Sequence, residues 1–279
     1  MKHGVERFSS VFGTTKPIIG MVHLKPLPGA PRYNSREGMQ SIIDMALKDA
    51  EALVSGGIDA LQVENQWDRP FQKSEDIGYE TVAAITAVIE NLKTQFEIPM
   101  GVTVHLNAVK QAIAIAVATG CKWVRAFELA NAYISNAGFI EAAGPSAMRY
   151  RYFLRADDDV MIFGDFHVKH GSHQILADRS FSEQAEDVET ALGDALIVTG
   201  LKTGKPPDKD DIASLRDVVS IPVLIGSGLS LENSDQLLPL ADGAIVGSSF
   251  KIDNVLDNPV DGKRVASFMA KVKQIRGDS

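Results

Sequence analysis

Eight apolar runs alternate with amphipathic segments along the chain. Each run is short and nearly free of polar interruptions, as expected for strands buried on both faces of a parallel sheet. The predicted strands are Pro17–Leu24, Asp59–Asn65, Pro99–Asn107, Lys122–Leu129, Val160–Val168, Asp194–Thr199, Val223–Ile225 and Ala244–Val246. The alternation predicts an α/β fold, namely a (β/α)8 TIM barrel of the phosphate-binding type that forms one domain over residues 1–279.

The segments between the runs have helical spacing and recognisable ends. Ser180 with Glu183 fits a capping box, and Asp208 fits an amino-terminal cap. We therefore expect helices over Ser35–Val54, Gly78–Phe96, Ala108–Thr119, from Gly144, from Ser180, from Asp208 to about Val219, over Asn233–Leu240 and over Asp261–Arg276.

The connections differ in length at the two ends of the predicted barrel. Connections from helix to strand are minimal, whereas five connections from strand to helix are long: Lys25–Asn34, Gln66–Ile77, Ala130–Ala143, Lys169–Arg179 and Gly200–Pro207. Because long loops in compact domains are usually functional or disordered, this asymmetry places the site at the carboxyl ends of the strands.

Charge and composition exclude several classes of protein. The formal net charge is −8 and no basic stripe stands out, which argues against nucleic acid as a partner. The amino terminus lacks the apolar core of a secretory signal, and no run of about eighteen apolar residues occurs, so we expect a cytoplasmic protein without membrane insertion. Cys121 is the only cysteine, which excludes an internal disulfide.

Two glycine-serine corners follow the last two predicted strands. They are Gly226-Ser227-Gly228 and Gly247-Ser248-Ser249. Glycines at a strand end let backbone N–H groups approach an anion, and a following helix amino terminus adds partial positive charge. Tight turns alone would explain either corner, but the loops after strands seven and eight of such a barrel are a frequent phosphate site. The pair therefore predicts binding of a small phosphorylated ligand.

Polar side chains occupy the predicted strand ends opposite these corners. Alternation along strands predicts that Asp165, His167 and Lys169 point into the barrel mouth, and the same test applies to Gln62 with Glu64 and to Thr103, His105 and Asn107. His23 ends the first strand, and Glu128 and Arg125 have opposite parity in the fourth. A single histidine at such a place is often only structural, but unpaired charges that converge on one mouth are costly without a function.

The ionisable residues suggest acid–base chemistry. His167 and His105 are candidates for general acid or base, since imidazole titrates near neutrality. Asp165, Glu64 and Glu128 are candidates to orient them, to act as bases or to hold a divalent cation. Lys169 and Lys202 are also candidates for a Schiff base, although neither lies in a strand core that would depress its pKa.

No spacing in the chain establishes a metal site. HExxH, paired CxxC and EF-hand patterns are missing from the sequence, and Asp165-x-His167 is a weak ligand pair. The acids leave room for magnesium, manganese or zinc, but the metal and any other cofactor stay unknown. Asp157-Asp158-Asp159 precedes the fifth strand, so we interpret this acidic run as a solvated turn at the opposite face.

Four sequence strings together resemble the BtpA family, which includes SgcQ-like proteins. They are IGMVHLKPLPGAP (19–31), ALQVEN (60–65), GVTVHLN (101–107) and GSG (226–228), and the similarity covers nearly the whole chain. The resemblance implies a barrel of the phosphate-binding class. It also implies an association with photosystem I biogenesis for cyanobacterial members and with sugar-metabolism genes for others.

The leading hypothesis is an enzyme that acts on a sugar phosphate or ribosyl phosphate by isomerisation, epimerisation or aldol-type cleavage. Two alternatives stay open: an assembly or accessory factor of the BtpA type, and a metal-dependent hydrolase of phosphate esters or nucleotides. Because exposed faces of barrel helices often pair subunits, a homo-oligomer is a further expectation.

Overall fold

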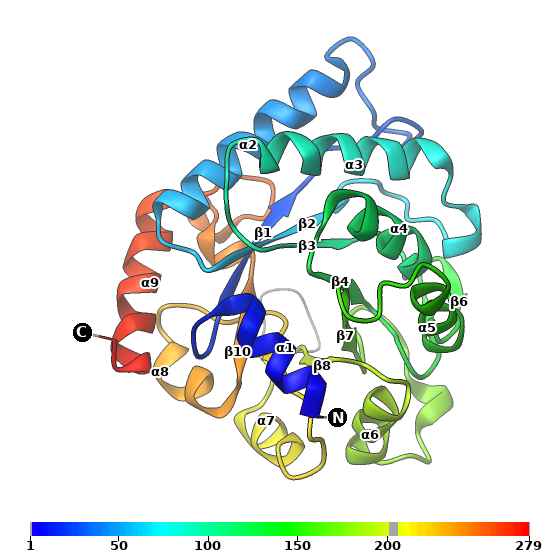
Figure 1. Cartoon of the computed structure of the whole chain (residues 1–279), viewed down its shortest axis with the longest axis vertical. Helices are drawn as coiled ribbons and strands as arrows, with labels where there is room; N and C mark the ends of the chain where they lie inside the picture. The colour runs from blue at the N-terminus through cyan, green and yellow to red at the C-terminus, as the bar shows by residue number, and fades with distance from the viewer. Residues whose placement is uncertain (1, 201–205, 279) are drawn as a thin grey trace.

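Eight parallel strands close into a barrel in the computed structural model, which describes residues 2–200 and 206–278 (Figure 1). The strands follow one another around the barrel in the order β1-β10-β9-β8-β7-β4-β3-β2. They are β1 (Ile18–His23), β2 (Ala60–Glu64), β3 (Met100–Thr103), β4 (Trp123–Ala126), β7 (Met161–Asp165), β8 (Ala195–Val198), β9 (Val223–Ile225) and β10 (Gly243–Val246). Every predicted apolar run overlaps one of these strands, which confirms the prediction of a TIM barrel.

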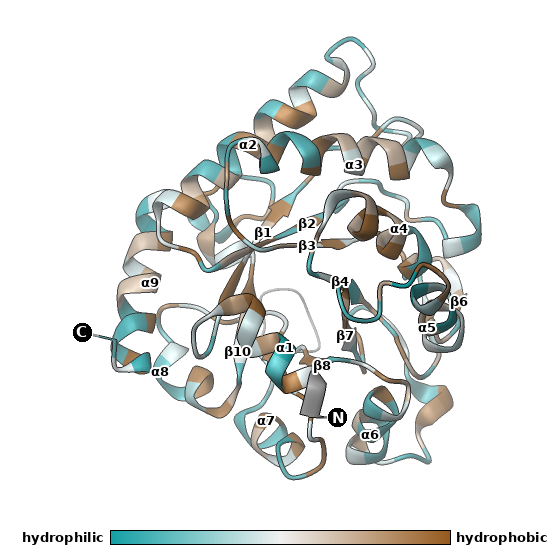
Figure 2. Cartoon of the chain, in the orientation of Figure 1, coloured by the Kyte–Doolittle hydropathy of each residue, from teal (hydrophilic) through white to brown (hydrophobic). Residues whose placement is uncertain are grey.

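Helices surround the barrel and cover its outer face. They are α2 (Gly38–Ser55), α3 (Tyr79–Lys93), α4 (Val109–Thr119), α5 (Gly144–Phe153), α6 (Phe181–Thr190), α7 (Lys209–Leu215), α8 (Ser234–Leu237) and α9 (Gly262–Arg276). Short 3-10 turns lie at Ser74–Asp76, Gln174–Leu176, Leu238–Leu240, Ser248–Phe250 and Ile252–Asn254. The capping box of Ser180 with Glu183 and the cap at Asp208 are both confirmed. In Figure 2 these helices carry alternating apolar and polar positions, as amphipathic helices do.

The apolar core has two layers that follow strand alternation. Side chains on one face of each strand pack under the helices, and those on the other face fill the barrel interior. Gly101 faces the buried Trp123 so closely that a Cβ at this glycine would lie 2.1 Å from the indole ring. The indole N–H donates to Gln62, which itself donates to Thr103. The predicted inward direction of Gln62 and Thr103 is thus confirmed.

An amino-terminal helix that the sequence pattern did not reveal closes one end of the barrel. This helix, α1 (Lys2–Phe12), packs Phe8 and Phe12 against Trp123 and Phe163, with ring centroids 5.2 Å apart for Phe12 and Trp123 and 6.0 Å apart for Phe8 and Phe163. Its two aromatic rings complete the apolar filling from below. The open end of the barrel is therefore the end formed by the strand carboxyl termini.

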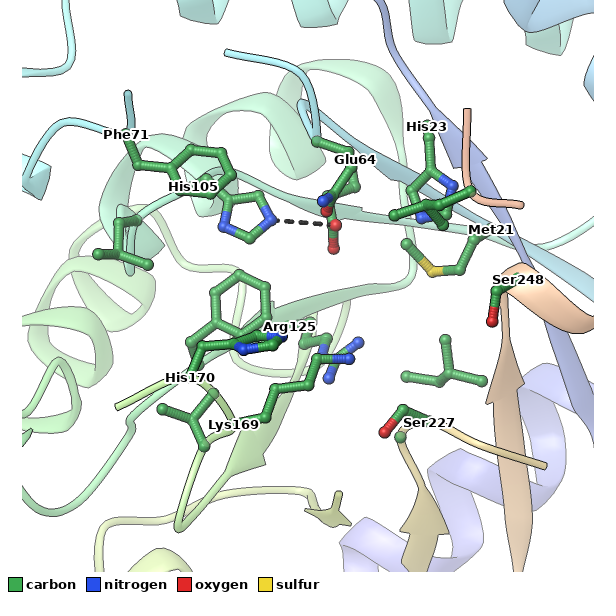
Figure 3. Close-up of a pocket in the computed structure, with 18 of the residues that line it drawn as sticks. Met21, His23, Glu64, Phe71, His105, Arg125, Lys169, His170, Ser227 and Ser248 are labelled. Carbon is green, nitrogen blue, oxygen red and sulfur yellow. Dashed lines mark ion pairs between the residues drawn. The ribbon is translucent and has the colours of Figure 1, made fainter. Parts of the chain in front are cut away.

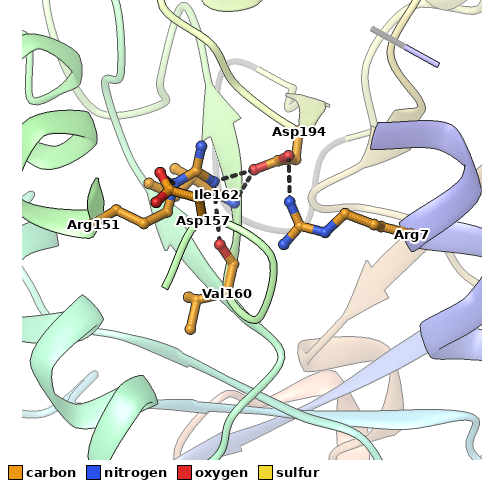
Figure 4. Close-up of polar contacts among 6 residues, drawn as sticks. All are labelled: Arg7, Arg151, Asp157, Val160, Ile162 and Asp194. Atoms are coloured by element: carbon orange, nitrogen blue, oxygen red, sulfur yellow. Dashed lines mark hydrogen bonds and ion pairs between the residues drawn. The ribbon is translucent and has the colours of Figure 1, made fainter. Parts of the chain in front are cut away.

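A polar network attaches α1 and α5 to the barrel at the same closed end (Figure 4). The carboxylate of Asp194 accepts hydrogen bonds from Arg151 at 2.6 Å, from the Ile162 amide at 2.8 Å and from Arg7 of α1 at 3.4 Å. Asp157 lies 3.9 Å from Arg151, and its side chain is 43% exposed. The acidic run 157–159 thus lies in a turn away from the barrel mouth, as predicted.

Several strands end earlier than the sequence pattern suggested. β3 ends at Thr103 and β7 at Asp165, so His105, Asn107, His167 and Lys169 all lie in loops. The loop after β4 also folds into a hairpin of β5 (Tyr133–Ser135) and β6 (Gly138–Ile140), which was not predicted. Within the described part of the chain, every helix is too short or too polar to span a bilayer.

Candidate functional site

A cavity of about 440 Å³ opens at the carboxyl ends of the barrel strands (Figure 3). This volume falls in the range of small-molecule sites. The predicted site residues that line it are His23, Glu64, His105, Lys169, Gly226, Ser227, Gly228, Gly247, Ser248 and Ser249. Both glycine-serine corners therefore share one cavity with four of the seven predicted ionisable residues.

The two corners present backbone amides and a hydroxyl without protein partners. Among the described residues, the N–H groups of Ser227, Gly228 and Ser248 meet no backbone or side-chain acceptor. The buried Ser227 hydroxyl also has no partner. Buried polar groups such as those of Ser227 are normally satisfied, and Gly228 and Ser248 line the same cavity, so these groups are available to an anion.

We call the amides of Ser227, Gly228 and Ser248, together with the Ser227 hydroxyl, the anion seat. Close packing restricts the neighbouring positions Gly226 and Gly247 to glycine. A Cβ at Gly226 would lie 2.3 Å from Ile197, and a Cβ at Gly247 would lie 3.1 Å from His23, so neither position has room for a larger residue. The Ser249 hydroxyl donates to the carbonyl of Leu229 at 2.6 Å and thereby ties the second corner to the first. The helix α8 begins only beyond the first corner, so the amides there act without a helix terminus.

His105 and Glu64 form an ion pair on the opposite wall. His105 Nε2 lies 3.0 Å from Glu64 Oε1, and both residues are buried. The imidazole is stacked between Phe71 and Phe127, with centroid distances of 4.3 and 4.5 Å. The backbone N–H of His105 donates to Asn65 at 2.8 Å. Stacking fixes the plane of the ring, and the hydrogen bond fixes the backbone that carries it.

Electrostatics keep the Glu64 carboxylate charged. Burial acts to raise its pKa, but His105, and then His23 and Arg125, outweigh burial and lower the pKa to about 2. Glu64 is therefore a stable anion that polarises His105, rather than a base that exchanges protons near neutrality.

His23 and Lys169 both have lowered pKa values. Burial lowers the pKa of His23 to about 4, so this histidine is neutral at pH 7, and its Nδ1 has no partner. Burial, followed by the charge of Arg125, lowers the pKa of Lys169 to about 8. The sequence-based expectation that Lys169 would keep an ordinary pKa is wrong, because the loop after β7 folds back into the cavity instead of into solvent.

Arg125 is a cavity residue that the sequence analysis left unassigned. Its guanidinium donates two hydrogen bonds of 2.7 Å to Asp165 and lies 5.1 Å from the centre of the Phe127 ring. Asp165 is fully buried beneath it and does not line the cavity. A charged residue inside the apolar run of the fourth strand was the available signal, because such a charge must have a buried partner.

His167 and Glu128 do not line the cavity, contrary to the predicted convergence on one mouth. His167 has a φ of 52°, so strand alternation no longer applies after Asp165, and its ring packs 4.2 Å from His173. Burial, followed by the charge of His173, lowers the pKa of His167 to about 4. Glu128 is fully buried, and burial with the nearby Asp165 raises its pKa well above the ordinary value.

The described residues contain no group of three His, Cys, Asp or Glu side chains that could hold a metal ion. A divalent cation thus stays an untested expectation. Lys202, the other predicted Schiff-base candidate, lies outside the described residues. Asn107, which strand alternation had also placed in the mouth, is buried and does not line the cavity; its amide donates to the carbonyls of Glu128 and Glu141.

The closed barrel with a polar cavity at its strand carboxyl ends defines a TIM-barrel protein. The chain belongs to the BtpA family, whose sequence model matches residues 14–274. It is 36% identical to an uncharacterized protein of Thermococcus kodakarensis, over 95% of this chain and 98% of the relative. It is 34% identical to the photosystem I biogenesis protein BtpA of Synechocystis, over 92% of this chain and 88% of the relative.

Solved structures with low sequence identity share the fold. A structure of Mycobacterium tuberculosis tryptophan synthase has a TM-score of 0.61 at 16% identity and covers 97% of this chain and 98% of its own. The native KDPGal structure has a TM-score of 0.56 at 13% identity, covering 92% and 95%. Thiamine phosphate pyrophosphorylase of Pyrococcus furiosus has a TM-score of 0.52 at 11% identity, covering 93% and 96%.

Proposed function

We propose that this protein is an enzyme that acts on a small phosphorylated metabolite, such as a sugar phosphate or ribosyl phosphate, by acid–base isomerase, epimerase or lyase chemistry at carbon. One observation carries the proposal: two corners with unpartnered amides face a set of ionisable side chains across a single cavity. An anion held at one wall would leave the carbon skeleton of the same molecule facing the other wall.

The residues divide into two groups by their chemistry. Ser227, Gly228 and Ser248 would bind the phosphate through N–H groups and hydroxyls. His105 would transfer protons to and from carbon, since its ring is fixed by stacking and its Nε2 lies 3.0 Å from the Glu64 carboxylate. The neutral His23 would assist at an oxygen of the substrate.

Solved TIM-barrel structures that share this fold carry the names of enzymes. Tryptophan synthase and thiamine phosphate pyrophosphorylase are among them, although below 25% identity the likeness is one of fold alone. Support for turnover therefore comes from the chemistry of the residues in the cavity.

A second candidate is an assembly or accessory factor. The observation in its favour is the 34% identity with the photosystem I biogenesis protein BtpA of Synechocystis. In that case the cavity would bind a ligand without converting it. A metal-dependent hydrolase has less support, because the described residues offer no three-residue metal cluster.

Isothermal titration with inorganic phosphate and with dihydroxyacetone phosphate tests the anion seat. Ser248 is half-buried at the second corner, so Ser248→Asp would place a carboxylate beside the bound phosphate. We expect binding to weaken at least about tenfold, since like charges at contact cost more than about 1.4 kcal/mol. Ser10→Asp is the matched control, because Ser10 is exposed on α1 at the closed end. Equal binding by both variants would refute the anion seat.

Turnover is tested separately by solvent exchange at carbon. Dihydroxyacetone phosphate in D2O should lose its C–H proton signals in the ¹H NMR spectrum when the enzyme is present. His105→Gln should abolish exchange while phosphate binding persists. If the wild-type protein binds the compound without exchange, and His105→Gln retains biological function in cells, the accessory role is favoured instead.

A further inference from the structure

Lys169 is the lysine that lines the cavity, and among the described residues its side chain has no partner. Lys251 is buried and pairs with Asp49, with Nζ 2.5 Å from Oδ2. Lys25 pairs with Glu37 at 3.4 Å. Within the described part of the chain, Lys169 makes neither an ion pair nor a hydrogen bond through its side chain, although it is half-buried in the cavity wall.

An unpartnered ammonium in such a place is costly, and the surroundings favour the neutral amine. Burial and the Arg125 guanidinium oppose a positive charge on Lys169, and the carboxylates of Glu64 and Asp165 only partly offset them. Arg125 itself is held by Asp165 and cannot move away. A lysine that is partly neutral at physiological pH is nucleophilic.

Lys169 lies in the cavity between the two glycine-serine corners and the wall formed by His105 and Glu64. Figure 3 shows Lys169 and Arg125 between the His105–Glu64 wall and the Ser227 and Ser248 corners. All of them line the one cavity of about 440 Å³. A compound of a few carbons bound by its phosphate at the corners would extend across the cavity past this amine.

We infer that Lys169 forms a covalent imine with a carbonyl group of the substrate, which makes the substrate class a small phosphorylated aldehyde or ketone. This inference rests on the proposed function, because the phosphate seat is what would bring the carbonyl carbon to the amine. It narrows the chemistry to reactions that use an imine as an electron sink, of which aldol-type carbon–carbon cleavage is the leading case.

The step balances without any further reactant. The lone pair of Lys169 Nζ attacks the carbonyl carbon, the π electrons move to oxygen, and a proton passes from nitrogen to that oxygen to give a carbinolamine. Loss of the hydroxyl group as water, with one proton supplied by an acid, leaves a protonated imine. His105 is the acid–base group of the cavity that is available to supply and recover that proton.

Borohydride trapping tests the inference on the intact protein. Dihydroxyacetone phosphate and unphosphorylated dihydroxyacetone are the two probes, and peptide mass spectrometry locates the reduced adduct. We expect an adduct at Lys169 with both probes at pH 7.5, in at least about tenfold higher yield with the phosphate when both are at low concentration. Lys169→Arg keeps the charge and should remove the adduct, whereas Lys25→Arg should leave it unchanged.

A pH series supplies a readout that a merely structural lysine would not give. Labelling of Lys169 should reach half its maximum near pH 8, in line with its lowered pKa.

The outcomes separate this inference from the proposed function. Binding of dihydroxyacetone phosphate without an adduct at Lys169 would refute the imine and leave the phosphorylated substrate standing. Equal labelling of Lys169 by both probes would keep the imine and refute the phosphate seat. Labelling of Lys169 no faster than that of Lys25 by either probe would overturn the inference.

Discussion

The buried pair of Arg125 and Asp165 should be a main determinant of stability at the open end of the barrel. Asp165 has no exposed surface, Arg125 is 5% exposed, and two hydrogen bonds of 2.7 Å join them. Asp165→Asn removes the negative charge and one strong acceptor but keeps the shape. Hydrogen bonds to charged groups contribute about 1.5–3 kcal/mol each, and a buried charge left unpaired costs about 3–5 kcal/mol.

We therefore expect Asp165→Asn to lower the free energy of unfolding by about 3–5 kcal/mol. This is a large share of the total free energy of unfolding of a typical domain, about 5–15 kcal/mol. Urea unfolding followed by far-UV circular dichroism measures this change. Asp157→Asn is the control, because its side chain is 43% exposed and 3.9 Å from Arg151, and it should cost less than about 1 kcal/mol. An Asp165→Asn variant within about 1 kcal/mol of wild type, at an unchanged denaturant slope, would refute the reasoning.

Two further predictions concern acid stability and packing. The folded pKa of His23 is about 4 against 6.5, so its stabilising effect is complete above pH 6.5 and is lost as pH falls toward 4. Wild type should lose about 2 kcal/mol more than His23→Gln between pH 7.5 and 5 in urea titrations, and parallel losses would contradict the buried neutral state. Gly101→Ala, with its Cβ 2.1 Å from Trp123, should cost about 1–3 kcal/mol or more. Gly4→Ala is the control, because a Cβ there would lie 3.7 Å from its nearest neighbour, and its melting temperature should stay within a few degrees of wild type. Equal losses of stability for both alanine variants would contradict the packing argument.

The oligomeric state and the binding partners of the protein stay predictions, which the purified protein can be used to test. A homo-oligomer and the lack of nucleic-acid binding follow from sequence arguments alone. A cavity that is complete within one chain, as this one is among the described residues, does not require a second subunit for ligand binding.

Local pattern was enough to predict most of the barrel. The apolar runs fall on the strands, the capping residues fall on helix starts, and the long loops fall at the end where the cavity opens. Such features depend on neighbours within a few positions, which is the range that hydrophobic periodicity and capping chemistry report. The amino-terminal helix was not predicted, because its apolar residues Phe8 and Phe12 pack only against the end of the barrel that this helix covers.

Which residues line the cavity depends on where each strand ends. Alternation holds only while the backbone stays extended, so it placed Glu64 correctly and failed for His167, where a positive φ turns the chain. His105 reaches the cavity from a loop, held there by Phe71 and Phe127 from two other loops. No rule of sequence spacing connects such distant positions.

By itself, the sequence of this protein determined the class of fold, the end of the barrel that carries the cavity, and the two glycine-serine corners, because these depend on chain-local periodicity and backbone freedom. Tertiary structure alone decided which charges are paired and which are not: Asp165 pairs with Arg125, whereas Lys169 has no partner among residues 2–200 and 206–278. Burial and pairing set the cost of a charge, and both are properties of neighbours that only folding brings together.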